Sequence, residues 1–89
     1  MGEKKMENEY DIMEVDAWLD GEGWTYNQTW KLCTVKSDSK NERRLFMDTL
    51  HKHGWRFRKG SIRIVYDGSI YELIDSKTEE PLFCMIPNY

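Results

Sequence analysis

The pattern of apolar and polar positions divides the 89-residue chain into strands, one helix and further strands. Apolar and polar residues alternate from Glu9 to Leu19, which is the period of a strand with one buried face. A second alternating segment starts at Trp24, and Asp20-Gly21 between the two predicts a two-residue hairpin turn. That turn would pair Ala17 with Trp24. The residues expected on the core side of these strands are Met13, Val15, Ala17, Leu19, Trp24, Tyr26, Trp30 and Leu32.

The segment from Ser39 to Gly54 has the features of a helix. Ser39 and Glu42 have the spacing of a capping box, in which each side chain binds the backbone amide of the other residue. Gly54 stands where a residue of positive φ commonly ends a helix. The apolar stripe along the helix consists of Phe46, Met47 and Leu50. We therefore expect this helix to anchor on a sheet through Phe46.

Short strands follow the helix. Residues 55–59 and 62–66 alternate, and Asp67-Gly68 predicts a second two-residue turn, which would pair Ile64 with Tyr71. The continuous apolar run at residues 82–86 indicates a strand that is buried on both faces and lies centrally or beneath the helix.

The expected fold class is α+β, a small and mostly antiparallel sheet with one helix packed on one face. Five to six strands are expected, in a β-β-α-β-β-β-like order. Residues 1–8 are expected to be frayed, and residues 9–89 to form a single domain.

Composition narrows the class of protein. A hydrophobic content of 39% with 13% aromatic residues argues for a packed core. No apolar run is long enough to span a bilayer, and the N-terminal residues have no apolar stretch of a secretory signal. We therefore expect a cytoplasmic protein that does not bind membranes. In that compartment Cys33 and Cys84 are expected to be reduced and buried.

Charge is distributed unevenly along the chain, although the net charge is only −3. Residues 1–23 carry eight acids and two lysines (−6), residues 24–63 ten basic residues and three acids (+7), and residues 64–89 one lysine and five acids (−4). Opposite patches can neutralise each other on a solvated surface. The alternatives are a basic face for a polyanion or an acidic face for a basic partner.

The sequence contains no constellation that predicts catalysis, a metal site or a cofactor. His51 and His53 are two residues apart on a helix, so they point in different directions. The chain has no glycine-rich phosphate loop and no serine-nucleophile motif. The acidic residues at positions 14–22 lack the spacing of a calcium loop, and a solvated strand edge is the favoured interpretation.

The first functional hypothesis is a protein-interaction module. Strand alternation places Trp18 on an acid-bearing outer face, where aromatic side chains flanked by charge are typical interface anchors. The predicted contact residues for a protein partner are Glu14, Asp16, Trp18 and Asp20. Alternatively, a second layer or the N-terminal segment covers Trp18. In size, acidity and aromatic content the whole chain resembles small accessory proteins of phages and other mobile elements, although no motif carries this likeness.

The second hypothesis is nucleic-acid binding by the basic middle of the chain. Lys and Arg would neutralise phosphates, and Trp55 or Tyr26 would stack on bases. The residues of this alternative site are Arg43, Arg44, Lys52, Arg56, Arg58, Lys59 and Arg63. The acidic net charge and the lack of any helix-turn-helix, RNP-type or zinc-finger signature argue against it.

Overall fold

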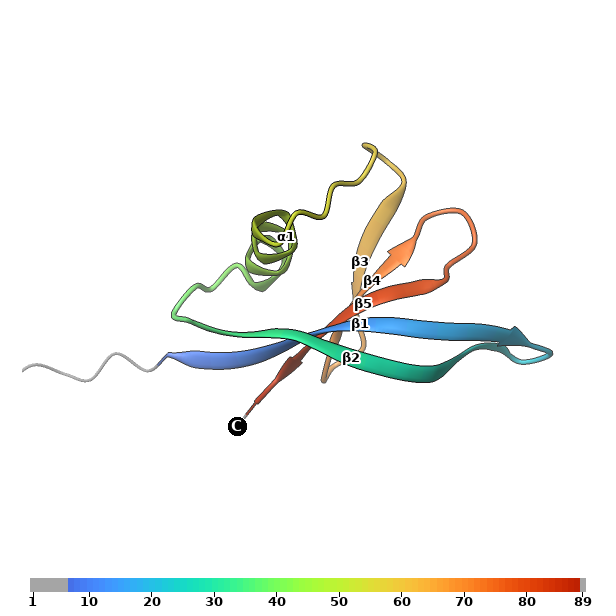
Figure 1. The fold of residues 1–89 in the computed structure, drawn as a ribbon, viewed down its shortest axis with the longest axis horizontal. Helices are drawn as coiled ribbons and strands as arrows, with labels where there is room; N and C mark the ends of the chain where they lie inside the picture. The colour runs from blue at the N-terminus through green and yellow to red at the C-terminus, as the bar shows by residue number, and fades with distance from the viewer. Residues whose placement is uncertain (1–6, 89) are drawn as a thin grey trace, which may run out of the picture.

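The computed structural model describes residues 7–88 and contains, within them, one helix and five antiparallel strands in one open sheet (Figure 1). The sheet order is β2-β1-β5-β4-β3. This confirms the α+β class and the β-β-α-β-β-β order. Most of the segment expected to be frayed lies outside the described residues. The elements are β1 (Asn8–Asp20), β2 (Gly23–Ser37), α1 (Glu42–Lys52), β3 (Ile62–Tyr66), β4 (Tyr71–Asp75) and β5 (Pro81–Pro87).

β5 is the central strand, as its continuous apolar run predicts. It pairs with β1 on one side and with β4 on the other. Phe83, Cys84 and Met85 are all buried, so both faces of the sheet are covered at this strand.

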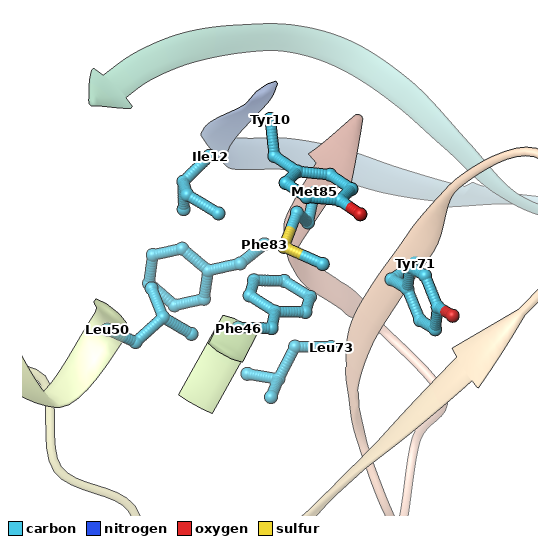
Figure 2. Close-up of a cluster of buried hydrophobic side chains, with 8 residues drawn as sticks. All are labelled: Tyr10, Ile12, Phe46, Leu50, Tyr71, Leu73, Phe83 and Met85. Atoms are coloured by element: carbon cyan, nitrogen blue, oxygen red, sulfur yellow. The ribbon is translucent and has the colours of Figure 1, made fainter. Parts of the chain in front are cut away.

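The core is a cluster of eight buried side chains from the helix and three strands (Figure 2). Phe46 and Leu50 contribute from α1 and have no exposed surface. Burial of apolar area on this scale is the main force that holds a small domain together. The other six members are Tyr10, Ile12, Tyr71, Leu73, Phe83 and Met85.

The cluster corrects the expected core face of β1. Val15 is buried as expected, but Tyr10 and Ile12 on the other face are the most buried residues of the strand, and Leu19, which was expected in the core, is 65% exposed. The physical reason is that both faces of the sheet are apolar where β1 meets β5, and the cluster with α1 lies on the face of Tyr10. No member of the cluster lies near the hairpin turn.

The helix begins later than the capping box predicts. Asn41 is the N-cap, and its side chain accepts a hydrogen bond from the Arg44 backbone amide at 3.1 Å. Ser39 instead closes a local turn, in which its hydroxyl oxygen accepts from the Asn41 amide at 3.2 Å. Gly54 has a φ of 91° and follows the helix as expected.

Both hairpins have a register two residues away from the predicted one. Ala17 pairs with Tyr26, and Tyr66 pairs with Tyr71. In each case the Asp precedes the turn and accepts hydrogen bonds from amides inside it: Asp20 from Glu22 at 2.8 Å, and Asp67 from Ser69 at 2.9 Å. Because the shift is two residues, each strand keeps its faces next to the turn.

Two bulges in β2 change the faces further along that strand. Asn27 and Leu32 have no partner of their own on β1, so the alternation of β2 reverses at each of them. Trp30 consequently lies opposite Glu14 and is 47% exposed, although simple alternation placed it toward the core.

Residues 55–59 do not form the predicted strand. Trp55 follows Gly54 closely, and its backbone amide donates to the Leu50 carbonyl at 3.0 Å, so it completes the end of the helix. Its indole packs edge-on against Phe83, with ring centroids 4.9 Å apart. The alternation of this segment therefore reflects packing against β5 rather than strand pairing.

Candidate functional site

The outer half of the β1–β2 hairpin projects from the rest of the sheet as a two-stranded arm. β5 pairs with β1 only from Tyr10 to Glu14, so residues 15–29 of the hairpin pair with each other alone. We call residues 15–29 the arm. It extends to the right in Figure 1 and contributes to the elongated shape of 57 × 26 × 21 Å.

Two tryptophans lie on one face of the hairpin: Trp18 within the arm and Trp30 directly after it. Register places Trp30 opposite Glu14 and Trp18 opposite Thr25, and even-numbered residues of β1 share one face. Trp18 is 59% exposed and Trp30 is 47% exposed. The four-residue offset along β1 corresponds to roughly 13 Å between the two positions. We call this surface the indole face. It consists of Glu14, Asp16, Trp18 and Trp30.

The predicted contact residues differ in what their side chains do. Glu14 and Asp16 are half-buried on the indole face, Glu14 opposite Trp30 and Asp16 between Glu14 and Trp18 along β1. Asp16 accepts a hydrogen bond from the Asn27 side-chain amide at 2.8 Å, which fixes its carboxylate on the arm.

Asp20 is a turn residue. Its two carboxylate oxygens accept from the Glu22 amide at 2.8 Å and from the Thr25 hydroxyl at 3.0 Å. These hydrogen bonds, that from Glu22 above all, lower the pKa of Asp20. Both oxygens of the Asp20 carboxylate therefore accept hydrogen bonds that stabilise the hairpin turn.

The opposite face of the arm is tied to β4 and to the β4–β5 turn. The Trp24 indole donates to the Thr78 carbonyl at 2.9 Å, and the Tyr26 hydroxyl donates to the Glu72 carboxylate. Burial, followed by the hydrogen bond to Glu72, raises the pKa of Tyr26. Because these contacts hold one side of the arm, the indole face is the side that is left open.

Cys84 in β5 is fully buried, whereas Cys33, which was also expected to be buried, is only half-buried; both cysteines are free thiols. Burial raises the pKa of Cys84 to about 11, with a further contribution from the Glu72 charge. A thiol with such a pKa carries almost no thiolate at neutral pH and is a poor nucleophile.

Four of the seven basic residues of the alternative site contact other groups of the same chain. Arg43 lies over the Tyr71 ring at 5.6 Å from its centroid, and Arg44 pairs with Asp48 at 3.6 Å. Arg56 donates to the His51 carbonyl at 2.6 Å, at the carboxyl end of the helix. Arg63 pairs with Glu79 at 3.6 Å.

The remaining three cations of that site, Lys52, Arg58 and Lys59, are exposed. Within residues 7–88 none of them forms an ion pair. No acidic residue occurs between Asp48 and Asp67, so this part of the chain keeps a positive charge.

Trp30 is an exposed aromatic residue that strand alternation placed in the core. A signal was present in the sequence, because Gln28 has the same parity as Trp24, Tyr26 and Trp30. A polar side chain at a position expected in the core indicates a break in the alternation. The bulge at Asn27 is that break.

Comparisons give no further guide to function, since no family model, curated protein sequence or solved structure matches the chain. Among the described residues no group of His, Cys, Asp and Glu side chains has the arrangement of a metal site. In the same part of the chain, no helix has the length and apolar content that crossing a bilayer requires.

Proposed function

We propose that this chain is a protein-interaction module that binds its partner through the indole face of the arm. The observation that supports the proposal is the pair of exposed tryptophans, Trp18 and Trp30, on one side of a projecting hairpin. Tryptophan is enriched among the residues that dominate binding energy at protein interfaces.

The partner that suits this face has an apolar pocket bordered by basic side chains. An indole inserted into such a pocket could contribute about 2–4 kcal/mol. Glu14 and Asp16 would mainly accelerate encounter and make binding sensitive to salt. In this proposal α1 covers one face of the sheet at the start of β1, and the open surface begins where that cover ends.

The experiment compares adjacent residues on opposite faces of the arm. Trp18→Ala and Trp30→Ala are expected to abolish or strongly weaken capture of the partner from the native host. Leu19→Ala is the matched control, because Leu19 is 65% exposed but lies on the other face. Equal losses for Trp18→Ala and Leu19→Ala would contradict the assignment to the indole face.

Nucleic-acid binding is the second candidate, and the acid-free segment with Lys52, Arg58 and Lys59 favours it. Arg58→Glu would then reduce salt-dependent retention on heparin and the shift of a nucleic-acid probe. If Arg58→Glu removes binding and Trp18→Ala does not, the basic segment is the functional surface and the indole face is not.

A further inference from the structure

A cavity of ≈ 430 Å³ opens at the end of the sheet away from the arm, where β1 and α1 begin and β3 and β5 end. Four chain segments that are distant in sequence supply its walls. None of its lining residues belongs to the indole face. The residues that matter for its chemistry are Glu7, Glu9, Tyr10, Glu42, Tyr66 and Pro87.

The charged residues that line the cavity in the described part of the chain are all acidic. Glu9 is partly compensated, because the Lys36 ammonium lies 3.8 Å from one of its oxygens and Asn88 donates to the other at 3.1 Å. Glu42 forms no ion pair with any Lys or Arg in residues 7–88. Burial raises the pKa of Tyr10 and of Tyr71, and the Glu42 charge raises both further, so this carboxylate lies close to two phenol hydroxyls.

Two stacked tyrosine rings lie beside the cavity, and an arginine side chain already contacts one of them. Tyr66 stacks on Tyr71 with ring centroids 4.4 Å apart, and the Arg43 guanidinium lies over the Tyr71 ring. Tyr66 is 49% exposed and faces the cavity as a lining residue. Figure 2 shows the hydroxyls of Tyr10 and Tyr71 directed to the same side, away from the apolar cluster.

We propose that this cavity binds an organic ammonium ion on a short alkyl chain, as found in a lysine side chain or a polyamine. The volume suits a small ligand, Glu42 and Glu7 supply charge, and Tyr66 and Pro87 supply the apolar contact that an alkyl chain needs. An ammonium ion over a tyrosine ring is a recognised favourable contact. A bare metal ion fits less well, since no group of metal ligands is assembled among the described residues.

The direct test is a titration of the ¹⁵N-labelled protein with n-butylammonium, followed by amide chemical shifts. Shifts are expected to concentrate at the start of β1, the first turn of α1, Tyr66 and the end of β5. Butan-1-ol, which has the same chain without the charge, should leave these amides almost unchanged.

Two pairs of variants separate the contributions. Glu42→Gln should weaken n-butylammonium about tenfold, whereas Glu80→Gln, in the β4–β5 turn, should leave affinity unchanged. Tyr66→Leu should weaken it about two- to fivefold, while Tyr66→Phe should retain it because the ring is kept. The amide spectrum of Glu42→Gln shows whether that variant is folded. If it is not, the proposal is tested by comparing the n-butylammonium affinities of Tyr66→Leu and Tyr66→Phe.

Several results would overturn the proposal: no localised shifts with n-butylammonium, equal shifts with butan-1-ol, or equal losses for Glu42→Gln and Glu80→Gln. Mg²⁺ that shifts the same amides at the same concentration would also overturn it, since any cation would then suffice. Titrations with spermidine and with Nα-acetyl-lysine amide distinguish the sources of the ammonium group by which one binds more tightly.

Discussion

The two halves of β1 present the same face of one strand to very different surroundings. Tyr10 and Ile12 are 3% and 0% exposed within the cluster that includes α1, whereas Trp18, further along that face, is 59% exposed. The residues between them, Glu14 and Asp16, mark the change from apolar to acidic. The comparison teaches that a large aromatic side chain is buried only where a second layer exists to meet it.

The largest effect is expected at the buried end, with Phe46→Ala. Phe46 has no exposed surface and sits among residues of three strands, so its truncation should lower the free energy of unfolding by about 3–5 kcal/mol. Chemical denaturation measures the change. A loss below about 1 kcal/mol would mean that α1 is not the cover of this face.

The next largest effect on stability depends on pH and concerns Cys84 in β5. Because the Cys84 pKa is raised from 9.0 to about 11 in the folded protein, folding favours the neutral thiol. The neutral Cys84 thiol contributes fully to the free energy of unfolding below pH 9. This contribution is lost as the pH rises toward 11, where the free energy of unfolding should be lower by about 1–2 kcal/mol.

Denaturation curves at pH 8, 9, 10 and 11 test this dependence. Cys84→Ala should make the decline shallower, even if its stability at pH 8 differs. An unchanged slope in that variant would assign the alkaline loss to other groups, of which Tyr26 is the first candidate because its pKa is also raised.

A smaller effect is expected where the arm meets β4. Tyr26→Phe removes the hydrogen bond to Glu72 and should cost about 0.5–1.5 kcal/mol. It should also increase hydrogen exchange of the arm amides more than that of β5. Tyr66→Phe is a suitable control, since the Tyr66 hydroxyl donates to the nearby Gly68 carbonyl and not to the arm among the described residues. Unchanged exchange in the arm would show that this contact does not hold the arm in place.

The smallest effect on stability is expected on the indole face itself. Trp18→Ala and Trp30→Ala should each change the free energy of unfolding by less than about 0.5 kcal/mol, because both side chains lie on the exposed surface outside the buried core cluster. A loss above about 1.5 kcal/mol for either variant would place that residue in the core and remove the contrast between the two halves of β1.

Patterns that depend on local chemistry predicted much of the fold. The apolar run of β5 predicted a central strand, and the stripe containing Phe46 and Leu50 predicted the buried side of the helix. The exposure of Trp18 agrees with one of the two alternatives that the sequence left open, the other being that a second layer or the N-terminal segment covers it. A role for that face in binding a partner stays a prediction.

The exact geometry of turns and bulges, and contacts between residues distant in sequence, could not be predicted. An Asp-Gly pair predicts a turn, but it does not decide whether Asp occupies the turn or precedes it as an acceptor, as Asp20 and Asp67 do. Alternation alone cannot place a bulge, so Trp30 was assigned to the wrong face. The contact of Trp24 with Thr78 joins residues 54 positions apart and has no sequence signature.

The two bulges in β2 also affect whether another extended chain can pair with the edge of the sheet. β2 is the outermost strand, and its unpaired amides and carbonyls would be a template for another extended chain. Asn27 and Leu32 interrupt this border, so that its regular runs are residues 23–26, 28–31 and 33–37. Stacking into fibrils needs about six or seven uninterrupted residues. We therefore expect the irregularity that places Trp30 on the indole face also to hinder pairing of another chain with the edge of β2.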